Sequence, residues 1–160
     1  MCGLGTNEEF VLKLVLGILF TLMVSAPAAA EWSEQQTAVW SVIQQSWVDD
    51  SEETGEWPTS FAADGYSSWG ETDALPSNLA ESDANVRFGD ESSTTRFYQI
   101  KPATIDINGD TAVVNYYATV VSENSEGERE RDVSAITETL VRRDGNWLFM
   151  ASSGWTPDLD

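Results

Sequence analysis

Residues 105–114 read IDINGDTAVV and place a tight turn between two runs of alternating side chains. Asn108-Gly109 is the strongest hairpin signal in the chain, because a two-residue turn needs positive φ angles that Asn and Gly accept. The turn predicts two antiparallel strands, Phe97–Ile107 and Thr111–Val121, with Pro102 marking an edge or a bend. A β-hairpin therefore forms the centre of the predicted fold.

Further strands are expected on the C-terminal side of this hairpin. A polar loop at residues 122–131 precedes a strand at Asp132–Arg142. The turn Asp144-Gly145 then leads into a last strand at Trp147–Ser153. These segments predict a meander of antiparallel strands.

The strand Thr111–Val121 has one mixed face and one face that is wholly apolar or aromatic. The apolar face carries Ala112, Val114, Tyr116, Ala118 and Val120. A sheet face that is open to water is normally clearly polar, so we expect both faces to be covered. Helices can cover only one face. We therefore predict a homodimer in which a partner protomer covers the other.

A helix is expected before the strands. Ser33 is placed as its N-cap, with Gln36 completing a capping box, and Trp40, Ile43 and Trp47 recur on one stripe. Acidic residues from position 49 onward oppose the negative end of the helix dipole, so the helix is predicted to end there.

The segment between this helix and the hairpin is less regular. A short second helix is predicted from Trp57-Pro58 to Asp64-Gly65, followed by a short strand at Tyr66–Trp69. Residues 71–85 are expected to be a loop with one helical turn near Leu79. Helices followed by strands predict an α+β domain, with a curled antiparallel sheet packed on N-terminal helices.

The first thirty residues have the order of a cleavable signal peptide. The run Leu14–Val24 carries no charge, and Ala28-Ala29-Ala30 supplies the small residues of a cleavage site before Glu31. An uncleaved anchor is the alternative, but eleven residues rise only about 16 Å as a helix, against a hydrocarbon core of about 30 Å. We predict a signal peptide at residues 1–30, a domain at residues 31–160 with no stable membrane anchor after cleavage, and a periplasmic or secreted location.

The domain that remains after cleavage is strongly acidic. The full chain has 27 acidic and 8 basic residues, and loss of Glu8, Glu9 and Lys13 leaves 25 and 7, a formal charge of −18. Such a surface repels nucleic acid and anionic lipid, because both need cationic partners. The acidic residues are scattered through expected loops, which is typical of a solubilising surface.

The domain contains neither His nor Cys, since Cys2 lies in the predicted signal peptide. This excludes Ser-His-Asp and Cys-His nucleophiles, zinc sites and thiol redox chemistry, and we predict no metal site and no cofactor. Asp106, Asn108 and Asp110 have the spacing that opens a calcium loop. Tyr117 stands where that loop needs a bidentate Glu, so a hairpin turn is the better interpretation.

The order of these motifs resembles the nuclear transport factor 2-like superfamily, in particular its SnoaL-like and ketosteroid-isomerase-like members. The resemblance rests on a leading helix that ends near Trp47 and on three segments: FAADGY at 61–66, GDTAVV at 109–114 and LVRRDGNW at 140–147. It implies a cone-shaped barrel with an apolar pocket between sheet and helices, usually dimeric. It implies no single activity, because the fold carries isomerases, cyclases, dehydratases and binding modules.

The catalytic residues of the isomerases do not carry over. The resemblance places the isomerase general base at Trp69, its hydrogen-bond-donating acid at Thr139 and its oxyanion-hole tyrosine near Gln45. The His that many SnoaL-like relatives carry on the last strand falls near Ser153. We predict no ketosteroid-isomerase-type activity, because an indole cannot take a proton from carbon and a threonine hydroxyl is a weak donor.

The resemblance also implies which side chains point into the pocket. The inward positions are Trp69, Asn115, Tyr117, Thr137 and Thr139. Their groups suit a small hydrophobic or aromatic molecule that also offers hydrogen bonds. The alternative is that the polar groups satisfy one another and the aromatic rings are part of the core.

Two carboxylates remain as catalytic candidates. Glu138 lies in a strand otherwise rich in Ser, Thr and Ala, where an inward orientation would raise its pKa and make it a general acid or base. We expect it to face water instead. Asp64 precedes Gly65, which is typical of a turn residue, although a place in the pocket would also make it an acid or base.

The leading hypothesis is an exported SnoaL-like domain that binds a small molecule in the cone pocket without classical catalysis. One alternative is an isomerase or hydro-lyase that uses Glu138, Asp64 or Tyr117. The other is an interaction module that takes a peptide or partner protein at the mouth of the cone.

Overall fold

The computed structural model describes residues 31–158, so the predicted signal peptide lies outside the described residues. The elements are, in chain order, α2 (Glu34–Ser51), β1 (Ala62–Gly70), β2 (Ser77–Asn78), α3 (Leu79–Ser92), β3 (Ser93–Asn108), β4 (Thr111–Asn124), β5 (Arg129–Arg143) and β6 (Asn146–Trp155). None of the helices in this part of the chain is both long and apolar enough to cross a membrane.

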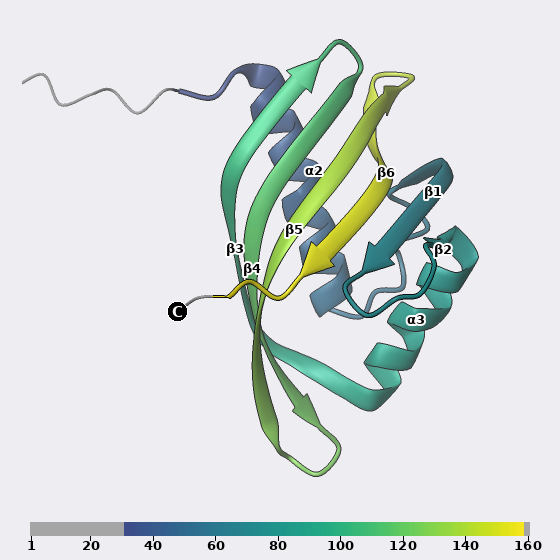
Figure 1. Ribbon diagram of the computed structural model, residues 1–160, viewed down its shortest axis with the longest axis vertical. Coiled ribbons are helices and arrows are strands. Elements are labelled where there is room, and N and C mark those ends of the chain that lie inside the picture. Colours follow the sequence, from purple (N-terminus) through teal and green to yellow (C-terminus); the bar gives the residue numbers. More distant parts are fainter. Residues whose placement is uncertain (1–30, 159–160) are drawn as a thin grey trace, which may run out of the picture. The chain divides into compact units, whose positions relative to one another are not determined.

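All six strands form one curled, unclosed sheet in the order β2-β1-β6-β5-β4-β3 (Figure 1). Neighbouring strands pair antiparallel except β1 and β6, which run parallel. The predicted α+β class and curled sheet are confirmed, but the expectation of a wholly antiparallel sheet is wrong at this pair. Parallel neighbours need a long crossover connection, and the segment from β2 to β5 provides it.

The helix α2 begins and ends close to its predicted limits. Ser33 is its N-cap and forms the predicted capping box with Gln36. The helix packs on the sheet through the buried side chains of Val39, Trp40 and Ile43. We call the sheet face that α2 covers the inner face and the opposite one the outer face.

The predicted second helix is wrong. Residues 57–61 form turns, and strand β1 begins at Ala62. The backbone N–H of Phe149 on β6 donates to the carbonyl of Phe61, and Gly65, with φ +85°, lies where the β1–β6 register shifts. The Asp-Gly pair that reads as a helix end is therefore part of a β-bulge, and pairing with a distant strand overrides the local pattern.

The helix α3 begins inside the loop predicted at residues 71–85, at the position of the single helical turn expected near Leu79, and continues to Ser92. Asn78 is its N-cap and Glu81 completes a capping box. Only Ser82 of this helix is buried, so α3 lacks the apolar stripe from which helices are recognised. The capping residues were the signal in the sequence that marked its start.

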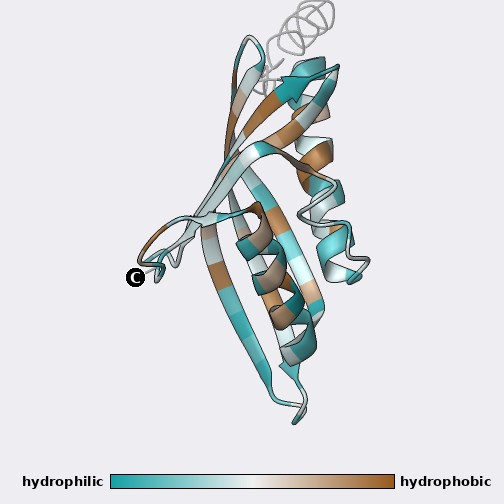
Figure 2. Cartoon of the chain, turned by 90° about the vertical axis from the view of Figure 1, so that its right-hand side faces the viewer, coloured by the Kyte–Doolittle hydropathy of each residue, from teal (hydrophilic) through white to brown (hydrophobic). Residues whose placement is uncertain are grey.

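The strands β3 to β6 run longer than predicted, and their hairpin turns are confirmed. Gly109 and Gly145 both have positive φ at the turns that join β3 to β4 and β5 to β6. The first residues of β3 and the last residues of β4, which lie far from the Gly109 turn, are mostly hydrophilic (Figure 2). The buried part of the sheet is therefore confined to the portion that faces α2.

In β4 the side chains alternate strictly between the two faces. Ala112, Val114, Tyr116 and Ala118 are buried on the inner face, with exposed fractions of 3% or less. They join a core that includes Val39, Trp40, Ile43, Tyr66, Ile105, Leu140, Trp147 and Phe149. The predicted apolar face of this strand is confirmed, and it is the face that positions the site described next.

Candidate functional site

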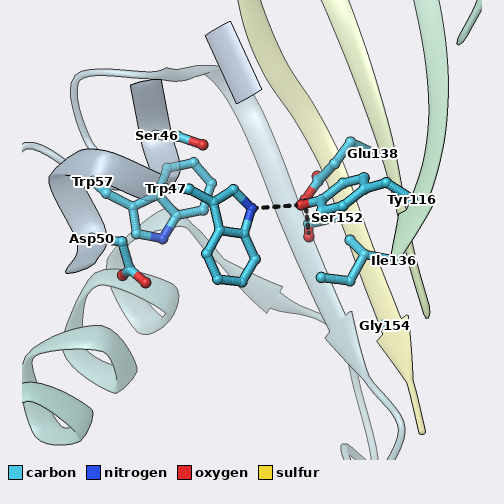
Figure 3. A pocket seen from close by; sticks show the side chains of 9 residues that line it. All are labelled: Ser46, Trp47, Asp50, Trp57, Tyr116, Ile136, Glu138, Ser152 and Gly154. Carbon is cyan, nitrogen blue, oxygen red and sulfur yellow. Dashed lines mark hydrogen bonds between the residues drawn. The ribbon is translucent and has the colours of Figure 1, made fainter. Parts of the chain in front are cut away.

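A pocket of about 180 Å³ lies between the last turns of α2 and the inner face of β4, β5 and β6. Its apolar walls are Trp47, Trp57 and Ile136, and its polar groups include those of Glu138, Tyr116 and Ser152 (Figure 3). The pocket therefore combines aromatic surface with a small group of convergent polar atoms, which is the usual composition of a small-molecule site.

Glu138 lies on β5, in register with Val114 of β4 and Ser152 of β6, and only 4% of it is exposed. Its Oε1 atom accepts hydrogen bonds from the hydroxyls of Tyr116 at 3.2 Å and Ser152 at 3.1 Å. Its Oε2 atom is buried and has no hydrogen-bond partner within the described residues. The expectation that Glu138 faces water is therefore wrong.

The protonation of Glu138 follows from this environment. Burial raises its pKa from 4.5 to about 8, while the hydrogen bonds from Ser152 and Tyr116 partly oppose the rise. A carboxyl group with this pKa is mostly protonated at pH 7. Because both donors point at Oε1, the proton belongs on Oε2, which gives a buried O–H donor beside an open pocket.

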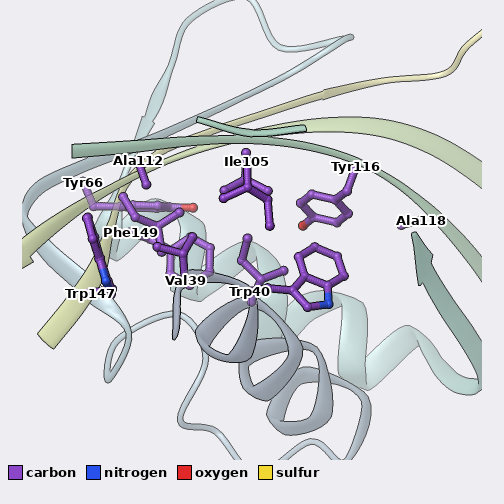
Figure 4. Close-up of a cluster of buried hydrophobic side chains, with 12 residues drawn as sticks. Val39, Trp40, Tyr66, Ile105, Ala112, Tyr116, Ala118, Trp147 and Phe149 are labelled. Carbon is purple, nitrogen blue, oxygen red and sulfur yellow. The ribbon is translucent and has the colours of Figure 1, made fainter. Parts of the chain in front are cut away.

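The hydroxyl of Tyr116 is held from both sides. The indole N–H of Trp47 donates to it at 3.1 Å, which leaves its own hydrogen to donate to Glu138. Trp40 packs edge-on against the Tyr116 ring, with centroids 5.7 Å apart (Figure 4). Burial first, and the Glu138 charge second, raise the pKa of Tyr116 far above its usual range, so the hydroxyl stays protonated.

Tyr66 is a second buried phenol near Glu138. It lies on β1 with 4% of its surface exposed. Burial, and after it the Glu138 charge, raise the pKa of Tyr66 to about 12. Both tyrosines therefore stay neutral at physiological pH and keep their hydroxyl hydrogens.

Asp50 is the second carboxyl group of the pocket. It lies in the last turn of α2 and contributes to the same wall as Trp57. Burial raises the pKa of Asp50 to about 6, with a further contribution from the charge of Asp90. At pH 7 this group is mostly ionised whereas Glu138 is mostly neutral, so the pocket holds two carboxyl groups in different states.

Four of the five residues predicted to point inward lie on the outer face of the sheet. Asn115 and Tyr117 alternate with the buried residues of β4, and on β5 Thr137 pairs with Asn115 and Thr139 with Val113. Thr137 donates to Asn115 at 2.7 Å. The assignment of these side chains to the pocket is wrong, because a one-residue offset in a strand moves every side chain to the other face.

The other two predicted site residues also lie outside this pocket. Trp69 is 54% exposed, and its indole N–H donates to the carbonyl of Asp73 at 2.9 Å. Asp64 is exposed on β1, just before the bulge at Gly65. The positions that correspond to the isomerase base and donor, Trp69 and Thr139, therefore both lie outside this pocket.

Sequence reasoning missed Tyr116, Ser152 and Asp50 as site residues. The orientation of Glu138 had a signal in the sequence, because Ile136 and Leu140 stand two residues to either side of it on the same strand face. An acidic residue between two apolar ones on a period of two is placed inward by that pattern. Asp50 had no such signal, since it belongs to an acidic run.

No group of three or more His, Cys, Asp or Glu side chains within residues 31–158 is arranged to hold a metal ion. The polar groups of the pocket instead include a neutral acid, the mostly ionised Asp50 carboxylate, a phenol and a serine hydroxyl. These groups can donate and accept hydrogen bonds and can exchange a proton, which suits recognition or proton transfer on an organic ligand.

Comparison with known structures shows the same fold at low sequence identity. A conserved protein from Planctomyces limnophilus DSM 3776 is 15% identical, with a TM-score of 0.67 over 77% of this chain and 98% of that protein. A ketosteroid isomerase-like protein from Erwinia carotovora atroseptica SCRI1043 is 11% identical, with a TM-score of 0.67 over 79% of this chain and 100% of its own.

An NTF2-like protein from Cytophaga hutchinsonii ATCC 33406 is 16% identical, with a TM-score of 0.65 over 78% of this chain and 100% of that protein. No curated protein matches the chain significantly in sequence. Residues 38–152, which include most of α2 and nearly all of the sheet, match the family model of the SnoaL-like domain. The chain therefore belongs to the SnoaL-like domain family, within the nuclear transport factor 2-like superfamily.

Proposed function

We propose that this domain binds a small molecule in the pocket beneath α2, and that neutral Glu138 donates a hydrogen bond to it. The observation that carries this proposal is the Oε2 atom of Glu138, which is buried without a partner within the described residues. A buried polar group left unsatisfied costs about 1–3 kcal/mol, and a ligand with an acceptor atom would recover this energy on binding.

The walls and the volume of the pocket support a small aromatic ligand with an acceptor atom. A cavity of about 150 Å³ lined by apolar side chains is enough to bind benzene, and this pocket has about 180 Å³. Trp47, Trp57 and Ile136 provide surfaces for a planar ring, and Glu138 selects a carbonyl or similar acceptor. A four-ring steroid is too large to be enclosed, in line with the expected lack of ketosteroid-isomerase-type activity.

Benzamide is a suitable probe, because it joins one ring to one carbonyl. We expect it to shift the indole N–H resonances of Trp47 and Trp57 in a saturable way during an NMR titration. Glu138→Leu should weaken this binding by about tenfold or more, because a hydrogen bond to a buried partner is lost. Glu138→Gln retains a donor and should keep most of the affinity.

Thr137→Val provides the matched control, because Thr137 lies on the same strand but on the outer face. Its affinity for benzamide should equal that of the wild type. Saturable binding that is unchanged in Glu138→Leu would refute the assigned role of Glu138, and the lack of any saturable shift would refute the binding proposal.

A second candidate function is proton transfer of the isomerase or hydro-lyase type, and the state of Asp50 favours it. Two carboxyl groups whose pKa values are pushed apart are the usual arrangement of a general acid and a general base. Ionised Asp50 would take a proton from the carbon next to a carbonyl, and Glu138 would donate its Oε2 proton to the carbonyl oxygen, which forms an enol. The reverse step returns both protons.

The rate at which the methyl hydrogens of acetophenone exchange for deuterium in D₂O tests this candidate directly. Catalysis by the wild type above the buffer rate, lost in Asp50→Asn and in Glu138→Gln, would support the enzymatic function. Equal rates for the wild type and Asp50→Asn would leave ligand binding as the function of the pocket.

A further inference from the structure

We propose that the ligand of this pocket carries a positively charged group, such as an ammonium or amidinium, which lies in an adjoining acidic pocket. This inference rests on the proposed function, because it names the class of molecule that the Glu138 pocket binds. The neutral part of the ligand would contact Trp47 and Glu138, and the cation would lie between the ends of α2 and α3.

The adjoining pocket has a volume of about 160 Å³ and shares two residues, Asp50 and Trp57, with the first. Its carboxylates come from both helices: Asp49, Asp50 and the nearby Glu53 from the end of α2, and Asp83 and Asp90 from α3. A molecule that enters the first pocket therefore lies next to the second.

The charges in this second pocket are not balanced. Arg87 is its one basic residue, and that side chain already bonds Asp83, with the Arg87 Nε atom 2.9 Å from a carboxylate oxygen. The other four carboxylates are not matched by a basic residue in the pocket lining, and the charge of Asp90 contributes to the raised pKa of Asp50. An added cation would relieve this repulsion.

The position of these acids is also unfavourable for the helices themselves. The last turn of α2 contains acidic residues and no basic one, although the C-terminal end of a helix dipole favours positive charge. The last turn of α3, which includes Asp90, has no basic residue either. Such a departure from local preferences is expected where function requires it.

The independent sign of a ligand is the Glu138 side chain, which lines the first pocket, is buried and has an unpartnered Oε2 within the described residues. The acidic pocket alone would be an ordinary solvated surface. An organic cation fits better than a metal ion, because no three of the described acidic side chains are arranged to hold a metal. The ring of Trp57, which lines both pockets, can also contact a cation through its face.

Three related probes test the charge directly: benzamide, 4-(hydroxymethyl)benzamide and 4-(aminomethyl)benzamide. The last two differ in one polar atom and in charge but not in length. We expect the aminomethyl compound to bind about tenfold tighter than the hydroxymethyl compound at low salt, because a charge-assisted contact is gained. High salt should reduce this difference.

The double variant Glu53→Gln, Asp90→Asn should abolish the preference for the aminomethyl compound and leave benzamide binding unchanged. Glu52→Gln is the matched control, because it removes one charge from the same exposed end of α2 without lining the pocket. Its preference should equal that of the wild type.

The two proposals fail in different arms of this experiment. Benzamide binding with no preference for the amine would overturn the cationic ligand and leave the binding function intact. An amine preference that persists in the double variant would also overturn the assigned pocket. Loss of benzamide binding altogether would overturn the proposed function itself.

Discussion

The hydroxyl of Tyr116 donates to Oε1 of Glu138 across 3.2 Å between two neighbouring strands. The same hydroxyl accepts from Trp47 on α2, so the carboxyl group is fixed by a short chain of hydrogen bonds from helix to sheet. The other oxygen of Glu138 has no partner among the described residues. One oxygen of the carboxyl group is thus fixed by hydrogen bonds, and the other is buried without one in a residue that lines the pocket.

The stability of the domain should fall as the pH rises through the neutral range. The pKa of Glu138 is about 8 in the folded state and near 4.5 in the unfolded state, so the folded state holds the extra proton between these values. Its contribution is therefore fully present below pH 4.5 and lost as the pH rises through 8, at up to about 1.4 kcal/mol per pH unit. Asp50 acts in the same direction between pH 3.8 and about 6.

Urea unfolding of the wild type and of Glu138→Gln at several pH values measures this effect. The difference in free energy of unfolding between the two proteins should change with pH across the range from 5 to 8. Glu130→Gln, at an exposed position on the same strand, should show no such change. A constant difference for Glu138→Gln would contradict a buried neutral acid.

Replacement of Tyr116 by Phe should destabilise the domain by about 1–3 kcal/mol, because the Trp47 indole and Glu138 Oε1 each lose a partner. The same change should raise the pKa of Glu138, since the Tyr116 hydrogen bond favours the ionised form. Tyr117→Phe is the matched control on the outer face, where the side chain is 45% exposed. Its effect should stay within about 0.5 kcal/mol.

Much of the fold could be predicted from local sequence. The capping box at Ser33 and the two hairpins each depend on a few adjacent residues and are present, although the turn residues of the first hairpin are Gly109-Asp110 and those of the second are Asp144-Gly145. The parallel pairing of β1 with β6 and the bulge at Gly65 depend on contacts with a strand about eighty residues away. No local pattern specifies such a pairing, so residues 62–65 at the start of β1 are predicted as the end of a helix, whereas the strand predicted at Tyr66–Trp69 is present.

The candidate site is predicted less well than the fold, because a one-residue offset along a strand moves the chosen side chains to the other face of the sheet. Transfer of pocket positions from the family pattern selected Asn115 and Thr137, whose side chains bond each other on the outer face. The chain's own alternation places Tyr116 inward, and the apolar neighbours of Glu138 on its own strand do the same. Burial patterns within this sequence were therefore a better guide to the pocket than the family pattern.

The outer face gives the predicted homodimer a specific surface. Tyr117, Trp155 and Trp69 are about half exposed, and Tyr117 and Trp155 flank Ala135 in one row across the sheet. In a chain with a net charge of −19, a second copy of a weakly charged, aromatic face is a favourable partner. We expect a dimer at tens of micromolar by light scattering, and a monomer for Tyr117→Glu with Trp155→Glu. A wild-type monomer would contradict the homodimer.

N-terminal sequencing tests the predicted export and cleavage of the signal peptide. Removal of residues 1–30 should leave a protein that begins at Glu31, because the apolar run is followed by Ala28-Ala29-Ala30. N-terminal sequencing of the protein from the periplasm or the medium should read Glu-Trp-Ser-Glu. A product that retains Lys13 would show that the segment is not cleaved at this site.

The protonation of Glu138 is measured most directly by NMR, from the side-chain carboxyl carbon of a sample labelled at glutamate, with the resonance assigned by its loss in Glu138→Gln. We predict a pKa of about 8 for the free protein. Benzamide should raise it further, because an acceptor ligand stabilises the protonated form. A resonance that titrates near 4.5 and does not respond to benzamide would contradict both the buried neutral acid and its role as the donor to the ligand.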